Sequence, residues 1–346
     1  MDEQRIDAYY QLIKKLLECP NGEEPRILNA HNDLLDPGLL EAIIAVAKQF
    51  DDNGNQNVVN FLANVALQIG EFHGSEQQEI TIRKETADIL LKWGCEQFYI
   101  SRFALAFDCW QQCLIIYQAI QDRQGEADSL GNLGITYESL GEYERAIAFH
   151  EQSLVIKREM KNRQGEAITL GNLGNAYLLL GEYDRAIPFY EQHLIISREV
   201  KDRQAEANSL GSLGNASSFL AEYERAIFFY EQSLAISREI KDRKGEASSL
   251  VNLGNAYQSL AEYERAIYFY EQSLAISREI KYRQGEASSL GSLGSAYQSL
   301  AEYEQAIYFH EQHLAISREI KDRRGEASSL GSLGSAYQSL AEYEQA

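Results

Sequence analysis

The chain repeats itself every 40 residues, and this period constrains the fold more than any other feature. The tripeptide Gly-Glu-Ala or a close variant begins at positions 125, 165, 205, 245, 285 and 325. A tyrosine recurs at the same interval, at Tyr143, Tyr183, Tyr223, Tyr263, Tyr303 and Tyr343. A fixed period of about 20–50 residues is typical of a stacked array in which each unit packs only against its neighbours. We therefore expect one continuous array over most of the chain.

Each unit reads as two amphipathic helices, which we name helix A and helix B. In the unit 162–200, helix A is predicted over 163–180, because Leu173 and Tyr177 fall on one apolar stripe with helical spacing. Gly181 follows as a helix stop. Helix B is predicted from Tyr183 to Val200. Neither helix alone can shield its stripe from water, so neighbouring units must stack.

A glycine stands in the middle of every helix A, at Gly134, Gly174, Gly214, Gly254, Gly294 and Gly334. A glycine inside a helix costs about 1 kcal/mol relative to alanine, so its recurrence requires a packing reason. The expected partner is an alanine of helix B, which recurs at Ala146, Ala186, Ala226, Ala266 and Ala306. Two small residues would let the helix axes approach closely, and Tyr177 or Tyr190 would then fill the space beside them.

The stretch Leu173-Gly174-Asn175-Ala176-Tyr177, followed by Ala186 and Tyr190, resembles the tetratricopeptide repeat signature. The 40-residue length is similar to that of a subclass that includes Pins/LGN-type scaffolds and many cyanobacterial proteins. The stretch Leu-Leu-Glu-Cys-Pro-Asn-Gly-Glu at 16–23 resembles cyanobacterial proteins whose repeats precede a CHAT domain. The resemblance implies an all-α fold, a right-handed α-solenoid of helix-turn-helix units with an N-terminal helical cap. We expect the cap at 1–80 and the array at 81–346, as six two-helix units and one terminal helix A.

The two ends of the chain differ from the repeats. Residues 1–80 should form an amphipathic helix through Tyr9 and Leu16 and two further helices at 39–50 and 58–69. At the other end, the last helix A is expected to stop near Leu340 and to leave its apolar stripe uncovered. We expect this sequence to be a fragment of a longer protein.

Composition excludes several classes of partner. The formal charge of −20 repels phosphate backbones, so we expect neither nucleic acid nor an anionic membrane as a partner. No apolar run approaches the roughly 20 residues that span a bilayer, and no signal peptide is visible. Four cysteines do not make a disulfide framework in a chain of 346 residues. A cytoplasmic location is predicted.

The chain offers no recognisable catalytic chemistry. It contains no P-loop, dinucleotide loop or nucleophile elbow, so we expect no catalytic residue, no cofactor and no enzyme activity. His310 and His313 are spaced i, i+3, and other units have tyrosine and serine at these positions, so no metal site is predicted. Cys109 and Cys113 are expected to be small buried residues. An arginine three residues before each glutamate of Gly-Glu-Ala predicts either an ion pair or, less simply, contacts to a ligand.

The tetratricopeptide resemblance assigns the concave lining to helix A. The protein-binding candidates are Asn132, Asn172, Asn175, Ser212, Asn215, Asn252, Asn255, Gln258, Ser292, Ser295 and Gln298. These side chains are small and uncharged, and carboxamides carry both donors and acceptors that suit the backbone of an extended peptide. The basic residues with which related grooves grip carboxylates are absent from these positions. The alternative is that the row is only a solvated polar surface.

Three aromatic residues of helix B, Phe228, Tyr268 and Tyr308, are predicted to point outward as convex contacts. The leading hypothesis is a non-enzymatic scaffold that binds an extended peptide or partner segment in the concave groove. The alternative is the regulatory repeat arm of a larger multidomain enzyme, such as a CHAT-type protease. A third hypothesis is self-association through the uncapped C-terminal helix or the convex aromatic row.

Overall fold

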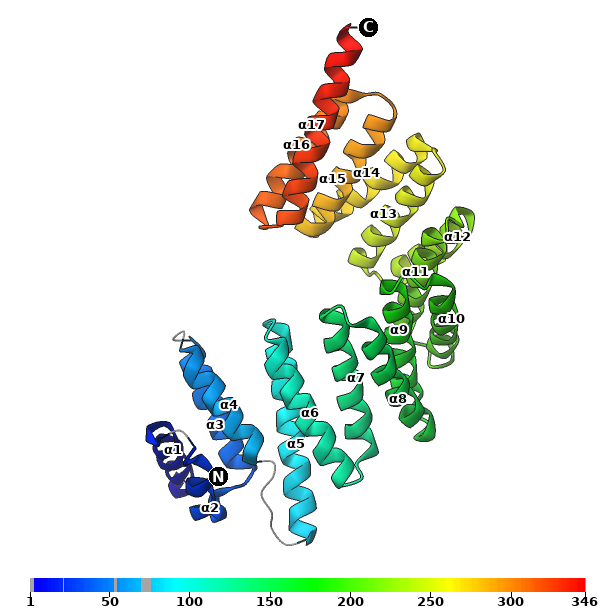
Figure 1. The fold of residues 1–346 in the computed structure, drawn as a ribbon. Helices are drawn as coiled ribbons and strands as arrows, with labels where there is room; N and C mark the ends of the chain where they lie inside the picture. Colours follow the sequence, from blue (N-terminus) through cyan, green and yellow to red (C-terminus); the bar gives the residue numbers. More distant parts are fainter. Residues whose placement is uncertain (1–2, 21, 53–54, 70–75, 346) are drawn as a thin grey trace. The chain divides into compact units, whose positions relative to one another are not determined.

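The computed structural model describes residues 3–20, 22–52, 55–69 and 76–345. These residues form seventeen α-helices, one 3-10 helix and no strand, which confirms the all-α fold. The chain divides into two compact units, Met1–Asn172 and Leu173–Ala346 (Figure 1). We describe each unit by itself.

The first unit contains a set of N-terminal helices and the first repeats. Its elements are α1 (Glu3–Glu18), α2 (Glu24–Ala30), the 3-10 helix η1 (Asn32–Leu34), α3 (Pro37–Asp52), α4 (Gln56–Ile69), α5 (Glu76–Tyr99), α6 (Phe103–Ala119), α7 (Arg123–Ser139) and α8 (Tyr143–Glu159). Helix α9 (Arg163–Leu179) contains the boundary between the units. The predicted helices at 39–50 and 58–69 correspond to α3 and α4, whereas α2 and η1 were not predicted.

The N-terminal helices share one core with the first repeat. Leu12 of α1, Leu39 of α3 and Leu62 of α4 are buried in the same apolar cluster as Trp93 of α5 and Tyr117 of α6. Cys109 and Cys113 belong to this cluster and are fully buried, as the sequence predicted. Helices α1–α4 therefore cover one side of the α5–α6 pair.

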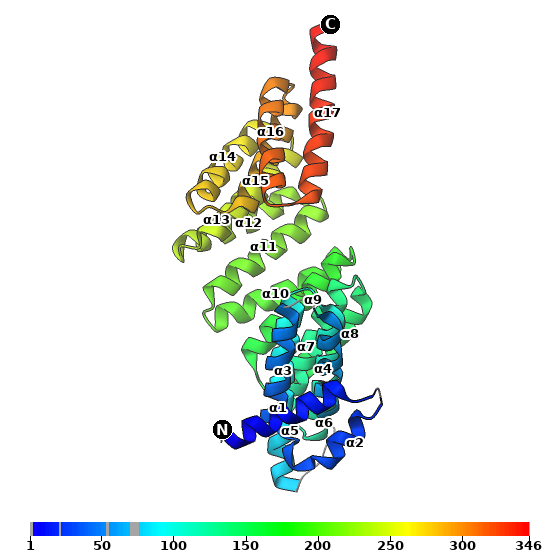
Figure 2. The ribbon, with the colours of Figure 1, turned by 90° about the vertical axis from the view of Figure 1, so that its left-hand side faces the viewer.

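The second unit is a regular stack of helix pairs (Figure 2). It comprises α10 (Tyr183–Glu199), α11 (Arg203–Phe219), α12 (Tyr223–Glu239), α13 (Arg243–Ser259), α14 (Tyr263–Glu279), α15 (Arg283–Ser299), α16 (Tyr303–Glu319) and α17 (Arg323–Gln345). The predicted helix limits agree with α9 and α10 to within one residue. Odd-numbered helices from α9 to α17 are helices A, and the even-numbered helices between them are helices B. Leu250, Leu253 and Tyr257 of α13 are buried, as expected for the apolar stripe of a helix A.

Most helices A begin at a side-chain cap. The Asp202 and Asp242 carboxylates accept hydrogen bonds from the backbone N–H groups of Ala205 and Gly245, both at 2.9 Å. Tyr282 stands at the equivalent position before α15 and forms no such bond, yet α15 begins at Arg283 in register with its neighbours. The backbone bond from Glu286 N–H to the Tyr282 carbonyl, 2.9 Å, closes the first turn there.

Helices A end at a residue with left-handed backbone, followed directly by helix B. Gly181 has φ +84°, whereas Ala221 and Ala261 adopt φ near +60° at the same position although alanine disfavours it. The prediction that the last helix A stops near Leu340 is wrong, because α17 continues to Gln345. In the other units helix B packs back against helix A and holds the left-handed turn. Among the described residues no helix B packs against α17 from beyond Leu340, and the helix continues.

The atoms nearest to five of the six recurring glycines of helix A belong to a ring of helix B and not to the expected alanine. A Cβ built on Gly254 would lie 2.4 Å from Cε1 of Tyr270, and Gly214 has the same relation to Tyr230. His310 takes the place of the tyrosine over Gly294. The ring four residues after the alanine is therefore the side chain that requires glycine at this position. Gly334 has no atom within 4 Å of its ideal Cβ.

The arginine ladder forms ion pairs within the array. Glu206, whose side chain is 8% exposed, accepts hydrogen bonds from Arg198 (2.8 Å) and from Arg203. Burial raises the pKa of Glu206, but the bonds from Arg198 and Arg203 outweigh it, so the pKa is lower than usual. Arg203 also pairs with Glu239 of α12. Arg123, Arg243 and Arg283 tie helix A to the following helix B in the same way. All six arginines pair with the glutamate three residues on, which confirms the ion-pair interpretation.

We expect Glu206→Gln to destabilise the protein by about 1 kcal/mol at pH 7, because two charge-assisted hydrogen bonds are lost at a partly screened site. The native carboxylate has a depressed pKa, so its contribution is present above the ordinary glutamate pKa and is lost as pH falls through the folded value. The difference in unfolding free energy between wild type and Glu206→Gln, measured in urea, should therefore shrink below pH ~4. The exposed Glu231→Gln is the control and should leave the melting temperature unchanged. An E206Q difference that is constant from pH 7 to pH 3 would contradict this account.

Candidate functional site

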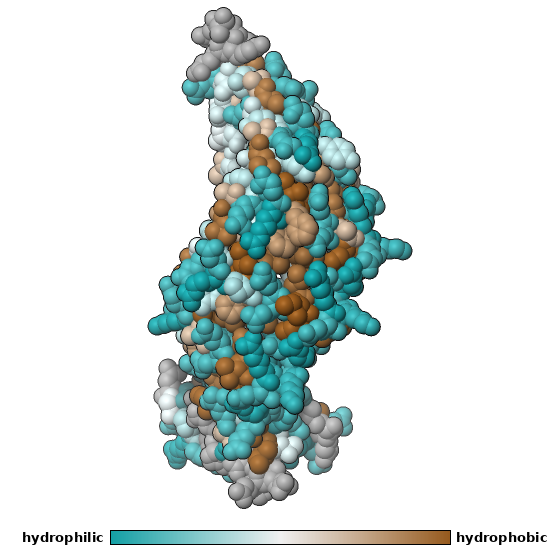
Figure 3. All heavy atoms as spheres, turned by 90° about the vertical axis from the view of Figure 1, so that its right-hand side faces the viewer, coloured by the Kyte–Doolittle hydropathy of each residue, from teal (hydrophilic) through white to brown (hydrophobic). Residues whose placement is uncertain are grey.

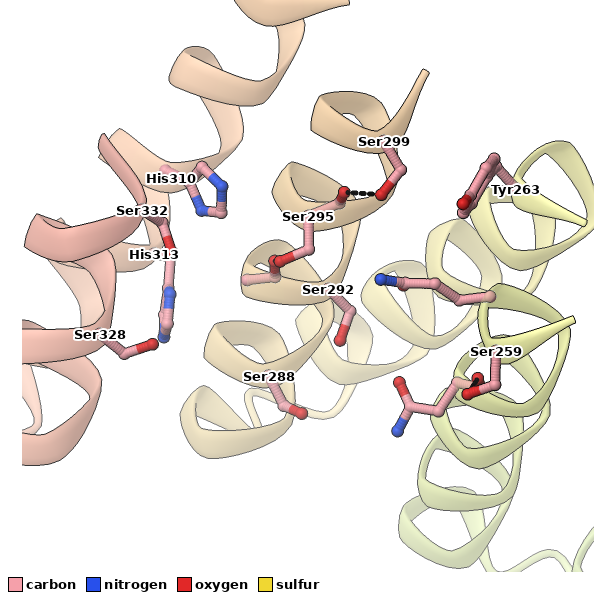
Figure 4. A pocket seen from close by; sticks show the side chains of 13 residues that line it. Ser259, Tyr263, Ser288, Ser292, Ser295, Ser299, His310, His313, Ser328 and Ser332 are labelled. Carbon is pink, nitrogen blue, oxygen red and sulfur yellow. Dashed lines mark hydrogen bonds between the residues drawn. The ribbon is translucent and has the colours of Figure 1, made fainter. Parts of the chain in front are cut away.

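One hollow of the second unit runs across three successive helices A. It encloses about 640 Å³ and is lined from α13, α15 and α17, with residues of α14 and α16 reaching in between them (Figure 4). We call it the helix-A groove. Its lining residues are Asn255, Gln258, Ser259, Tyr263, Ser288, Gly291, Ser292, Ser295, Ser299, His310, His313, Ser328 and Ser332. None of these residues carries a formal charge at neutral pH, although the chain as a whole carries −20.

A second hollow of about 410 Å³ lies one unit earlier, between α11 and α13. Ser212 and Asn215 of α11 face Ser248 and Asn252 of α13 across it. Asn252 Nδ2 lies 3.5 Å from Asn215 Oδ1, so the two helices are linked by a weak contact between carboxamides. Lys244 also lines this hollow.

The structure places the predicted binding residues in four different settings. Asn255, Gln258, Ser292 and Ser295 line the helix-A groove, and Ser212, Asn215 and Asn252 line the second hollow. Gln298 instead donates from Nε2 to Ser335 Oγ of α17 at 3.0 Å. The remaining predicted residues lie on α7 and α9: Asn132 and Asn172 are half-buried and belong to the first compact unit, and Asn175 is exposed in the second.

The asparagine row is held by tyrosine hydroxyls of helix B. Tyr190 donates to Asn175 Oδ1 at 2.8 Å, and Tyr230 donates to Asn215 Oδ1 at the same distance. The pair Tyr270 and Asn255 repeats the contact at 2.7 Å. These bonds use the carboxamide oxygens and fix the side chains, so the NH₂ groups are turned away from the tyrosines.

Burial raises the pKa of the tyrosines that hold this row. The effect is present for Tyr230 and Tyr270, and a hydrogen bond from Ser218 or Ser292 lowers it only in part. Both phenols therefore stay protonated at neutral pH and act as donors to Asn215 and Asn255. The asparagine orientation is thus maintained over the whole physiological pH range.

The serines of the groove present acceptors. Ser295 Oγ donates to the Gly291 carbonyl, and Ser299 Oγ donates to the Ser295 carbonyl, both at 3.0 Å (Figure 4). Ser259 does the same to Asn255 on α13. Each hydroxyl proton is thereby used within its own helix, whereas the oxygen lone pairs remain available to accept. The helix-A groove thus combines amide donors with hydroxyl acceptors.

His310 and His313 line the groove, although neither was a predicted site residue. His310 is 1% exposed, and its two ring nitrogens have no hydrogen-bond partner among the described residues. His313 Nδ1 lies 2.9 Å from Ser329 Oγ. The sequence contained a signal for His310. Each helix B with tyrosine at this position follows a helix A with asparagine fifteen residues earlier, whereas His310 follows Ser295.

Comparison with protein-family models identifies the repeat. The tetratricopeptide repeat model matches residues 97–159, 165–239, 229–279, 245–319 and 285–346. The chain belongs to the tetratricopeptide repeat family. A comparison with curated protein sequences finds no match.

Solved structures share the tetratricopeptide fold at low sequence identity. RapI in its apo form is 15% identical with a TM-score of 0.57, over 74% of this chain and 99% of that one. Aspartyl phosphate phosphatase F from Bacillus subtilis is 12% identical with a TM-score of 0.57, over 97% and 93% of the two chains. A Rap protein complexed with competence and sporulation factor is 12% identical with a TM-score of 0.53, over 98% of each chain. At these identities the likeness concerns the fold alone.

The helices B of the tetratricopeptide array carry the three predicted convex contacts. Phe228 of α12 and Tyr268 of α14 are each 59% exposed, and Tyr308 of α16 is 57% exposed. Each ring meets the neighbouring phenylalanine of its own helix edge-on, at 5.2–5.6 Å between centroids. In Figure 3, apolar patches alternate with hydrophilic side chains over the face shown. A contact role for these aromatic residues stays a prediction.

Two further properties of the tetratricopeptide chain concern metals and membranes. Among the described residues, no cluster of three or more His, Cys, Asp or Glu side chains could hold a metal ion. Within the same part of the chain, no helix combines the length and the apolar character needed to cross a membrane.

Proposed function

We propose that the helices A of residues 173–346 bind an extended segment of a partner protein. Family membership supports a role in protein–protein interaction. The observation that carries the proposal is the row of carboxamides at Asn175, Asn215 and Asn255, each fixed by a tyrosine hydroxyl. The NH₂ groups recur once per repeat and donate to backbone carbonyls of the bound segment.

Pre-organisation gives this row its value for binding. A free asparagine side chain loses conformational entropy when it binds, whereas one already held by a buried hydroxyl loses less. Serine oxygens of α15, the helix A that follows the asparagine row, such as those of Ser292 and Ser295, accept from backbone N–H groups of the same segment. A groove of this kind selects an extended backbone and does not require an acidic or basic partner.

The test isolates the amide donors. The triple variant Asn175→Asp, Asn215→Asp, Asn255→Asp keeps an oxygen that accepts from each tyrosine but removes the NH₂ groups. The triple Asn→Ser variant removes the same donors without adding charge. A peptide array with wild-type protein supplies the tightest peptide, and fluorescence anisotropy measures its affinity for each variant. We expect both variants to bind at least tenfold more weakly, which corresponds to about 1.4 kcal/mol.

The matched control is the triple variant Phe228→Ala, Tyr268→Ala, Tyr308→Ala on the helices B, which should bind the peptide as wild type does. Binding that survives both asparagine variants would contradict the proposal. Binding that is lost only in the aromatic variant would place the partner on the helices B. Circular dichroism melting of every variant checks that the fold is kept.

Other aspects of the function stay predictions. The N-terminal helices are proposed as the cap of the array, supported by the core they share with Trp93 and Tyr117. The four cysteines are free thiols, which fits a reducing compartment such as the cytoplasm. A regulatory role in a larger enzyme and self-association through α17 remain alternatives to be tested.

A further inference from the structure

The pair α15 and α16 differs from its neighbours at two positions that face each other. In the preceding pair, Tyr270 donates to Asn255 Oδ1 at 2.7 Å and lies 2.9 Å from Gln258 Oε1. His310 and Ser295 occupy the places of this tyrosine and asparagine in the pair α15 and α16. The internal hydrogen bond is therefore missing in this pair.

The missing groups leave space within the helix-A groove. The His310 ring lies over Gly294 as Tyr270 lies over Gly254, with the nearest ring atom 2.6 Å and 2.4 Å from the ideal Cβ. The imidazole thus occupies the base of the tyrosine site but has no phenol hydroxyl, and Ser295 has no carboxamide. Figure 4 shows the His310 ring lying between α16 and the serines of α15. Both residues line the 640 Å³ hollow.

The His310 side chain lines this hollow, and its two buried nitrogens are unsatisfied among the described residues. Burial, together with the neighbouring His313, lowers the pKa of His310 to about 4, so the ring is neutral at pH 7. A neutral imidazole has one donor nitrogen and one acceptor nitrogen, and neither has a partner among the described residues. Other residues that line the same hollow include Ser292 and Ser295 of α15, Ser328 and Ser332 of α17 and His313 on its own helix, none of which is charged at neutral pH. Leaving buried nitrogens unpaired costs free energy, which a ligand with the right groups recovers.

We propose that the hollow between His310 and Ser295 is the subsite for an asparagine or glutamine side chain of the bound segment. The inference rests on the proposed function and names the side chain that the groove selects. A carboxamide carries both an acceptor and donors, which match the neutral imidazole and the serine oxygens. It also restores the chemical group that Asn255 supplies in the neighbouring pair. A carboxylate offers no donor, and an aliphatic side chain would leave both nitrogens unpaired.

The test uses a set of extended nonapeptides of glycine, serine and threonine in which one central residue is glutamine, asparagine, glutamate or leucine. Titrations record the imidazole ¹⁵N signals of His310, the side-chain amide signals of Asn215 and Asn255, and the affinity. The double variant Ser295→Asn, His310→Tyr rebuilds the internal pair and fills the subsite. We expect glutamine and asparagine peptides to bind wild type at least tenfold more tightly than glutamate and leucine peptides and to shift the His310 signals. The double variant should lose this preference while it melts at or above the wild-type temperature.

The outcomes separate the two proposals. If the peptides shift the signals of Asn215 and Asn255 without any preference for a carboxamide, the subsite is wrong and the peptide groove stands. A carboxamide preference that persists in the double variant likewise overturns the subsite. If no peptide shifts any of these signals, both the subsite and the proposed groove are overturned. The variant His310→Phe is a second control, because it keeps Ser295 but removes both nitrogens, and it should also lose the preference.

Discussion

Gly254→Ala is expected to destabilise the protein by about 2–3 kcal/mol, even though alanine favours a helix more than glycine does. The added Cβ would lie 2.4 Å from Cε1 and 2.6 Å from Cδ1 of Tyr270. Tyr270 is fully buried and its hydroxyl is held by Asn255, so the ring has no free space into which to move. The clash therefore forces α13 and α14 apart.

The matched control is Gly334→Ala at the equivalent position of α17, where no atom lies within 4 Å of the ideal Cβ. This variant should gain up to about 1 kcal/mol from helix propensity. Urea unfolding compares the two, and hydrogen exchange of the α13 amides reports whether the loss is local. Equal stability of the two variants would show that the tyrosine does not require glycine beneath it.

Acidification is expected to remove about 2 kcal/mol of stability through His310 alone between pH 7 and pH 4. Burial and the neighbouring His313 lower its pKa in the folded protein from the ordinary value of 6.5 to about 4. The unfolded chain therefore takes up the proton first as pH falls below 6.5. The stability that the neutral His310 ring contributes is therefore fully present above pH 6.5. It declines as pH falls from 6.5 and is lost near pH 4.

The comparison of wild type with His310→Tyr isolates this effect, because the carboxylates and His313 titrate in both proteins. Urea unfolding is measured at half-unit steps from pH 7.5 to pH 4. As pH falls, the unfolding free energy of the tyrosine variant should become progressively larger than that of wild type. Burial also lowers the pKa of His313, which makes it the one near neighbour to monitor by NMR. A difference between the two proteins that does not change with pH would mean that His310 is protonated as readily when folded as when unfolded.

The helices of the array could be predicted well from the sequence, because the same cap, apolar-stripe and stop residues recur in successive repeats. The limits of α9 and α10 follow from two local signals. Asn162 Oδ1 caps the start of α9 by accepting from the Gly165 N–H at 2.9 Å, and Gly181 ends helix A. The partner of Gly254 was assigned to Ala266 and is Tyr270. Spacing along one helix shows which residues share its stripe. It does not show which of two residues four positions apart on the next helix lies against the glycine.

The groove was predicted only in part for a similar reason. Asn255 and Ser292 were assigned to it correctly by their place on helix A, but their chemistry depends on contacts across helices. The hydroxyl of Tyr270 takes the carboxamide oxygen of Asn255, which no helix-A pattern reveals. His310 was considered in the sequence only as a metal ligand, and it lies in the groove with no partner for either nitrogen among the described residues. Ser295 and His310 are the two residues of this groove at which the repeat changes both members of the asparagine–tyrosine pair.

The most direct test of the peptide groove follows the asparagine side chains during binding. With ¹⁵N label confined to asparagine, titration of the tightest array peptide should shift the side-chain amide signals of Asn175, Asn215 and Asn255. The amide of Asn162, which accepts from Gly165 at the start of α9, should stay in place as the internal control. Signals of the three asparagines that remain unmoved at saturating peptide would contradict the proposal that the helices A hold the partner.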